Sequence, residues 1–197
     1  MLPRFQPLPL ATLQDLLRNS NEEKIALGGF RNQGACWQTF DVAESDKVAK
    51  LVRLIDFPVE EDVKGSLSQG EIRHGVYREI SIIEGPLKNL QGKVIPRCHG
   101  PYAGTRTHVR YLDDTDYEEW WLFMVENAGE CLHGTLLSDE DCKRITSKYH
   151  ALHKAGVLHC DVEIRHWFRT PSGDIRLINF DRAKSVGFLF IIGRVSG

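Results

Sequence analysis

The segment from His159 to Asp181 reads HCDVEIRHWFRTPSGDIRLINFD and carries the clearest local pattern of the chain. It opens with a His-x-Asp triplet and closes with Asn-Phe-Asp, eighteen residues further along. Between them, the turn residues Pro-Ser-Gly-Asp separate two apolar segments, which is typical of a β-hairpin. We therefore expect two polar triplets joined by a hairpin.

The residues before this segment predict a capped helix. Ser138 is a good N-cap, and Glu140 and Asp141 place negative charge in the first turn. Gly156 stands where a helix commonly ends with a glycine. Between these ends, helical spacing is followed by Cys142, Ile145, Tyr149 and Leu152.

Further towards the N-terminus, strand-like and loop-like segments alternate. Two strand-like segments flank Gly34, and Gly85 and Pro86 interrupt or bend a later helical pattern. Because strands come first and helices follow, the order predicts an α+β fold with an antiparallel sheet. The expected elements are strands within 24–31, 35–42, 46–57, 92–104 and 120–129, a loop at 58–71 and a helix at 71–91.

The sequences HKAGVLHCDVEIRHWF and GDIRLINFDRA resemble the catalytic loop and the metal loop of the protein-kinase fold. They are more closely similar to the kinase-like proteins common in fungi, whose pattern is His-x-Asp-(Val/Ile)-x-x-Arg-Asn followed by Asp-Phe-Asp. The upstream LKNLQGKVIPRCHGPYAG resembles the segment after helix C in those proteins. The resemblance covers about residues 24–185 and implies ATP and Mg²⁺ as cofactors.

The resemblance implies a protein-kinase-like α+β fold, with an antiparallel, five-stranded N-lobe sheet and helix C, plus a partial helical C-lobe. Only 16 residues follow Asp181, whereas a full protein kinase continues through further helices. The expected organisation is a mobile leader with one short helix at 1–22, an N-lobe-like part at 23–127, a partial C-lobe at 128–185 and an atypical apolar tail at 186–197.

The resemblance implies that Asp161 is the carboxylate facing the acceptor hydroxyl and that His159 holds its loop. The alternative for Asp161 is a solvated residue after a helix end. The family's metal-binding Asn falls on His166 and its metal-binding Asp on Asn179. An imidazole and a neutral amide suit Mg²⁺ poorly, so Asp181 or Glu163 would serve as a substitute ligand. The alternative for Asp181 is a salt bridge with an arginine, Arg182 or Arg165.

The cation on the phosphates would be Lys50, with Lys47 as an alternative, and its helix partner would be Glu79, with Glu84 and Glu71 competing. The phosphate cradle would come from Gly28, Gly29 and Gly34 between two strands, although hairpin glycines explain them equally well. The adenine would meet the backbone of Glu126 to Ala128, and Met124 would lie near the gatekeeper position. A core strand that runs into a turn has the same appearance.

Composition limits the classes of partner. The net charge of −2 gives no electrostatic case for nucleic acid or an anionic membrane. Five cysteines without a Cys-x-x-Cys pair suggest neither a disulfide framework nor a zinc site, and point to a reducing compartment, the cytoplasm. The expected partners are a nucleotide and a protein.

Two functions follow from these expectations. The first is a phosphotransferase with altered metal ligands and weak or absent activity. The second is a pseudokinase, a binding or scaffold module without catalysis. A chain without a stable fold is the third alternative.

Overall fold

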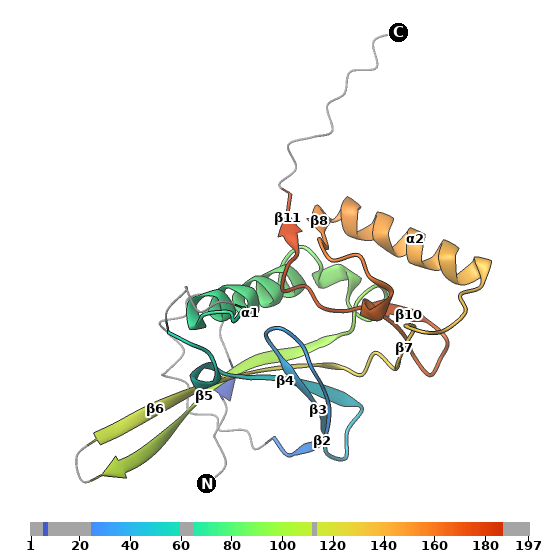
Figure 1. The fold of residues 1–197 in the computed structure, drawn as a ribbon. Helices are drawn as coiled ribbons and strands as arrows, with labels where there is room; N and C mark the ends of the chain where they lie inside the picture. The colour runs from blue at the N-terminus through green and yellow to red at the C-terminus, as the bar shows by residue number, and fades with distance from the viewer. Residues whose placement is uncertain (1–5, 8–24, 60–64, 112–113, 187–197) are drawn as a thin grey trace, which may run out of the picture. The chain divides into compact units, whose positions relative to one another are not determined.

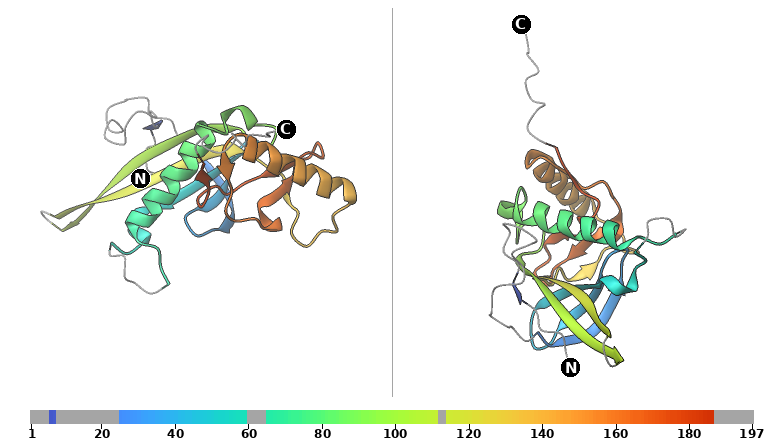
Figure 2. Two further views of the ribbon diagram at one scale, coloured as in Figure 1. Left: turned by 90° about the horizontal axis from the view of Figure 1, so that it is seen from above. Right: turned by 90° about the vertical axis from the view of Figure 1, so that its left-hand side faces the viewer.

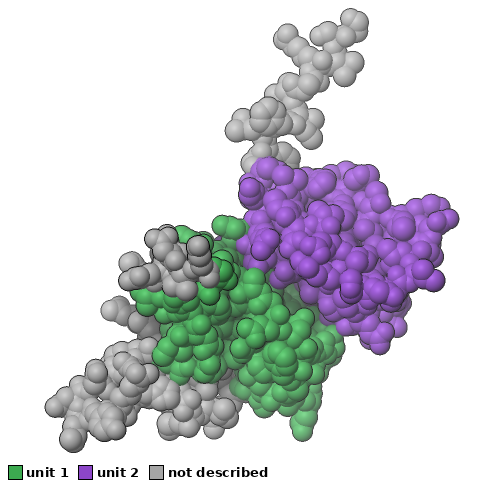
Figure 3. Space-filling view, in the orientation of Figure 1, with its two compact units in different colours: residues 1–80, 97–127 green, residues 81–96, 128–197 purple. Residues whose placement is uncertain are grey.

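The computed structural model describes residues 6–7, 25–59, 65–111 and 114–186. The chain divides into two compact units, shown in two colours in Figure 3. The first unit comprises residues 1–80 and 97–127, and the second comprises 81–96 and 128–197. Residues 81–96, which the sequence analysis assigned to the N-lobe-like part, thus belong to the second unit.

The first unit is built on an antiparallel sheet, as predicted. Its strand order is β1-β5-β6-β4-β3-β2, so it has six strands rather than five (Figure 1). The extra strand β1 comes from the expected leader and pairs with β5 through Gln6↔Ala103. The predicted short helix of that leader lies outside the described residues. The strands are β1 (Gln6–Pro7), β2 (Leu27–Gln33), β3 (Gln38–Val42), β4 (Lys47–Arg53), β5 (Cys98–Tyr111) and β6 (Asp114–Glu126).

Strand β4 is the buried centre of this sheet. Ala49 and Leu51 are buried on one face, where they pack with residues of β5 and β6. Val48 and Val52 are buried on the other face, and Lys50 lies between them in the strand. Because successive side chains of a strand point to opposite faces, a lysine at position 50 sits on a buried surface and needs a partner.

Strands β5 and β6 continue together beyond the rest of the sheet as a two-stranded arm (Figures 1 and 2). Strand β4 pairs with β6 only from Arg53↔Trp120 to Lys47↔Glu126, whereas the β5–β6 pairing runs on to Tyr111↔Asp114. The strands expected here, within 92–104 and 120–129, are shorter than β5 and β6, so the arm was not predicted. In the register of the arm, the backbone of Arg106 stands opposite that of Glu118.

Helix α1 (Gln69–Glu84) confirms a helix in this region, but it begins two residues earlier than expected and ends at Glu84 rather than at residue 91. The Ser68 hydroxyl accepts from the Glu71 N–H, and the Glu71 carboxylate accepts from the Ser68 N–H, which is a capping box. The helix stops at Gly85, where a Cβ atom would lie 2.6 Å from the Ser81 carbonyl oxygen. No helix in the described ranges is long and apolar enough to cross a membrane.

The second unit combines helix α2 (Asp139–Lys154) with two small antiparallel sheets, ordered β10-β9-β7 and β11-β8. Ser138 caps α2 in a capping box with Asp141, and Gly156 follows with φ of 72°, so both predicted ends are confirmed. The predicted hairpin is β9–β10, whose register includes Trp167↔Leu177. The remaining elements are β7 (Glu130–Cys131), β8 (Val157–Leu158), β9 (Trp167–Arg169), β10 (Ile175–Leu177), β11 (Lys184–Ser185) and the short 3-10 helices η3 (Lys88–Leu90) and η4 (Ile164–His166).

Candidate functional site

Lys50 and Glu79 form a buried ion pair in the first unit, as the sequence analysis expected of these two residues. The Lys50 Nζ atom lies 2.5 Å from Glu79 Oε1. Glu79 lies on the side of α1 that faces the sheet. It is 1% exposed, so its charge is almost fully withdrawn from water. Breaking such a pair is unfavourable, because the remaining charge stays buried. The role of this pair towards a nucleotide stays a prediction.

Trp37 completes this group, and the sequence analysis did not single it out. Its indole Nε1–H donates to Glu79 Oε2 at 2.7 Å, and the Lys50 ammonium lies 5.2 Å from the centre of its ring. Trp37 is buried and lies in the turn between β2 and β3, where the Gly34 N–H donates to the Trp37 carbonyl. Its only sequence signal is an aromatic residue beside a turn. We call Trp37, Lys50 and Glu79 the lysine cluster.

The three glycines of the predicted phosphate cradle do not share one loop. Gly28 and Gly29 lie inside strand β2, where the register to β3 shifts between Leu27 and Phe30. Only Gly34 lies in the turn after the strand. A Cβ atom at position 28 would meet the Asp41 Cβ at 3.3 Å, so this glycine allows two strands to approach closely. The expectation that Gly28 and Gly29 lie between the strands is therefore corrected.

The predicted adenine contacts Glu126 and Ala128 fall on a segment whose backbone is partly occupied. Glu126 ends β6, and its N–H donates to the Arg97 carbonyl at 2.8 Å. The next N–H, of Asn127, donates to the Asp46 carbonyl at 2.9 Å. Ala128 is buried and belongs to the second unit. The first two N–H groups are thus engaged within the first unit, and the adenine contact stays a prediction.

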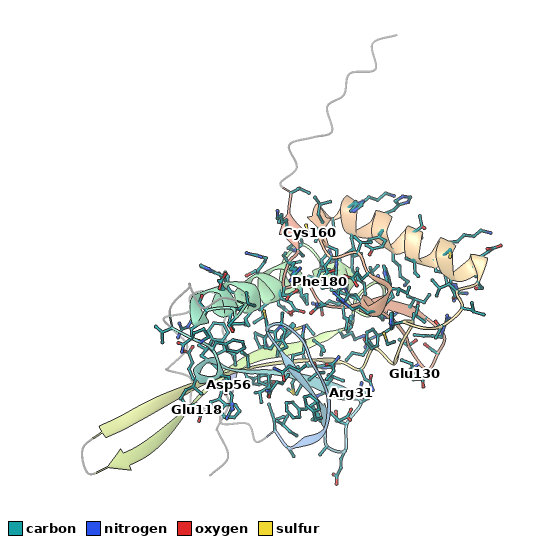
Figure 4. All side chains as sticks on the ribbon, viewed as in Figure 1. Arg31, Asp56, Glu118, Glu130, Cys160 and Phe180 are labelled. Carbon is teal, nitrogen blue, oxygen red and sulfur yellow. The ribbon has the colours of Figure 1, made fainter. Side chains whose placement is uncertain are left out.

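His159 anchors the loop that carries Asp161 in the second unit. Its Nε2–H donates to the Ile178 carbonyl at 2.9 Å, and its ring packs edge-on against Phe180 with 4.9 Å between centroids. Burial lowers the pKa of the His159 imidazole. Cys160 and Phe180, labelled in Figure 4, belong to the two segments that meet here. The contacts of His159 with Ile178 and Phe180 therefore bring the His-x-Asp triplet next to Asn-Phe-Asp, at the two ends of the hairpin.

Asp161 carries a carboxylate that is largely withdrawn from solvent, with a side chain 12% exposed. Its Oδ2 atom lies 3.8 Å from Arg165 Nη2 and 4.0 Å from His166 Nε2. Arg165 also pairs with Glu163 at 2.9 Å. The sequence analysis considered Arg165 only as a partner of Asp181, whereas the structure places its guanidinium beside Asp161 and Glu163.

The two residues at the positions where metal ligands were expected, His166 and Asn179, contact one another. The His166 Nδ1 atom lies 3.0 Å from the Asp161 carbonyl oxygen, and the Asn179 Nδ2 atom lies 3.4 Å from His166 Nε2. His166 is buried at the end of η4. The Ile178 N–H donates to the His166 carbonyl, which extends the β9–β10 pairing by one step and fixes Asn179 beside the imidazole.

The backbone adopts a left-handed conformation at two non-glycine residues of this region. Cys160 has φ of 62° and Asn179 has φ of 73°. Asparagine tolerates this region better than most residues, whereas a cysteine there costs about 1–3 kcal/mol. Residues held in such conformations concentrate at functional sites, which supports the choice of this loop as a candidate site.

The donor set around Asp161 does not fit Mg²⁺. Mg²⁺ demands octahedral oxygen ligands, whereas His166 offers a nitrogen that already faces Asn179. Asp181, the predicted substitute ligand, is buried. Among the residues that the structure describes, no group of three or more His, Cys, Asp or Glu side chains is placed to hold a metal ion. The second unit thus keeps the predicted carboxylate of Asp161 and presents an imidazole nitrogen where the resemblance led us to expect an oxygen ligand.

No family model and no curated protein matches the chain. Two solved structures of WbdD, one of them a co-crystal structure with a kinase inhibitor, are similar to it, with TM-scores of 0.52 and 0.54 and sequence identities of 16% and 15%. The matches cover 82% and 84% of this chain but 34% of the WbdD chain, so the chain spans about a third of that protein's length. The resemblance to fungal kinase-like proteins stays a prediction. The structural likeness identifies the fold alone: the chain has a kinase-like fold, with an antiparallel sheet and two α-helices in the residues that the structure describes.

Proposed function

We propose that the chain binds a nucleotide through the lysine cluster and that its phosphoryl transfer is weak or absent. The observation that carries the proposal is the ion pair between Lys50 and Glu79 at 2.5 Å. In phosphoryl transfer, a lysine fixed by a carboxylate supplies a positioned cation to the phosphates. The pair provides such a cation on a buried strand, at a position that the sequence resemblance selected independently.

Weak or absent transfer is proposed because of the second unit. Asp161 retains the carboxylate that would face an acceptor hydroxyl, but His166 and Asn179 face each other. Metal neutralisation of the transferring phosphate is a large part of phosphoryl-transfer catalysis, since the protein does little covalent chemistry. A donor set that does not fit Mg²⁺ therefore favours binding over turnover.

The proposal is tested by thermal melts of the whole chain with ATP. Binding to the folded state alone raises stability by about 2.7 kcal/mol when ATP is present at 100 times its Kd. We expect a rise for the wild type and a much smaller one for Lys50→Met. Lys47→Met is the matched control, because Lys47 lies on the same strand but its side chain points to the opposite face of the sheet.

A cooperative melt without any rise would contradict nucleotide binding and favour the second candidate, a scaffold that binds a protein partner. The observation behind this candidate is the pairing of His166 with Asn179 at the metal positions. Transfer itself is measured with radiolabelled ATP, using Asp161→Asn as the inactive reference. Turnover that is fast in the wild type and lost in Asp161→Asn would contradict the weak-activity part of the proposal.

A further inference from the structure

Arg165 is the residue that links the acidic and imidazole groups of the second unit. Its Nη1 atom lies 2.9 Å from Glu163, its Nη2 atom 3.8 Å from Asp161 and its Nε atom 3.3 Å from His166 Nε2. One guanidinium group thus approaches two carboxylates and an imidazole at once. A cation is already present where negative charge gathers in this loop.

The contacts of His166 fix the hydrogen on its ring. The Nδ1 atom faces the Asp161 carbonyl oxygen at 3.0 Å, and since a carbonyl only accepts, Nδ1 donates. The Nε atom of Arg165 only donates, so Nε2 of His166 must accept. Because Nε2 accepts, the Asn179 amide group that faces it is the donating Nδ2, at 3.4 Å.

The Nε2 atom of His166 is therefore already hydrogen-bonded and not available as a ligand for a divalent metal ion. To bind Nε2 it would have to displace an amide donor and a guanidinium, and the guanidinium would repel it. Arg165 alone would be a weak barrier, because its side chain is 54% exposed and such ion pairs are worth little. His166 is buried, however, and its amide contact is supported by the adjoining β9–β10 ladder.

We propose that the second unit excludes divalent metal ions, with Arg165 as its resident cation and the His166–Asn179 pair closing the ligand positions. We further expect that a nucleotide bound by the chain needs no divalent ion, because the second unit offers such an ion no ligand set. This last step rests on the proposed function, whereas the exclusion of metal stands without it.

The exclusion is tested on the whole chain with Mn²⁺ alone as the probe. Bound Mn²⁺ broadens the NMR signals of nearby amide groups. We expect no selective broadening at residues 159–166 or 178–181 in the wild type when Mn²⁺ is equimolar with the protein. Selective broadening there would overturn the exclusion, whatever the nucleotide does.

A double variant, His166→Asn with Asn179→Asp, supplies a positive reference. It replaces the imidazole with an amide, which offers an oxygen ligand, and the neutral amide with a carboxylate, so its affinity for Mn²⁺ is expected to rise at least tenfold. The control, His150→Asn with Asn89→Asp, makes the same two exchanges at exposed positions of the second unit and is expected to leave Mn²⁺ affinity unchanged. Equal affinities in the wild type and the double variant would overturn the role given to the pair.

The ligand class is tested by comparing melts with ATP in excess EDTA and in excess Mg²⁺. Equal rises are expected. A rise that requires Mg²⁺ would overturn the inference and leave nucleotide binding intact. The absence of a rise in both conditions would overturn nucleotide binding itself, and with it the ligand class, while the Mn²⁺ experiment would still decide the exclusion.

Discussion

Replacing Lys50 with methionine is expected to destabilise the first unit far more than removal of an ordinary surface charge. At the observed 2.5 Å, and with an effective dielectric constant of about 20, Coulomb's law gives roughly 7 kcal/mol of attraction between Lys50 and Glu79. Withdrawal of both charges from water offsets much of this attraction. In the variant, however, Glu79 stays buried without a cation beside it. The expected loss in the free energy of unfolding is about 3–5 kcal/mol.

The assay is urea unfolding followed by circular dichroism. With a slope of about 2 kcal/mol/M, the expected loss lowers the midpoint by about 1.5–2.5 M. The double variant Lys50→Met with Glu79→Leu removes both charges and replaces them with apolar groups. It is expected to recover most of the lost stability, because an apolar pair of similar volume often equals or exceeds a buried ion pair.

The coupling energy between the two substitutions shows whether Lys50 and Glu79 stabilise one another. A double variant whose loss equals the sum of the two single losses would show that Lys50 and Glu79 do not interact, and the reasoning from their distance would be refuted. Lys47→Met is again the control, with an expected change within about 0.5 kcal/mol, as for most surface substitutions.

Three further predictions concern the second unit. Burial raises the pKa of Asp174, but hydrogen bonds from Arg176 and Lys148 outweigh this effect and lower the pKa to about 2. The stabilisation from this carboxylate is therefore complete above about pH 4 and is lost as the pH falls towards 2. Because this side chain is 41% exposed, we expect the Asp174→Asn variant to abolish about 1 kcal/mol of that acid-dependent stability in pH titrations of the melting temperature. Gly129→Ala should prevent folding of the β7–β9 sheet, seen by circular dichroism, because its Cβ would lie 2.0 Å from the Arg169 carbonyl oxygen, whereas Gly134→Ala, also at positive φ but in open space, should cost about 1 kcal/mol. Ser138→Ala removes the N-cap of α2 and should cost about 1 kcal/mol in urea unfolding; an unchanged midpoint would contradict the capping box.

Elements whose signals are local were predictable from the sequence. The ends of α2 follow from Ser138 and Gly156, whose side chain and backbone act on the adjoining turn. The stop of α1 at Gly85 and the β9–β10 hairpin are local in the same sense. The pairing of Lys50 with Glu79 is not local, and it was expected only because a family resemblance linked the two positions.

Features that depend on distant partners were missed. The arm of β5 and β6 is defined by the register between two strands, which extends to Tyr111↔Asp114 and has no local sequence signal. The role of Trp37 depends on its hydrogen bond to Glu79, which lies forty-two residues away in the sequence. The contact between His166 and Asn179 was equally hidden, because the sequence analysis treated each as a separate lost ligand and not as a pair.

The placement of the aromatic residues gives the two units different optical properties. Three of the four tryptophans, Trp37, Trp120 and Trp121, lie in the first unit, and Trp167 is the remaining one. Trp167 is buried in the second unit, with the Tyr149 ring 5.1 Å away and edge-on to it. The tryptophan emission of a Trp167→Phe variant would therefore come from the first unit alone, and the difference from the wild type would isolate the signal of Trp167. Intrinsic fluorescence can thus report, without any attached dye, whether the two units unfold together or in sequence.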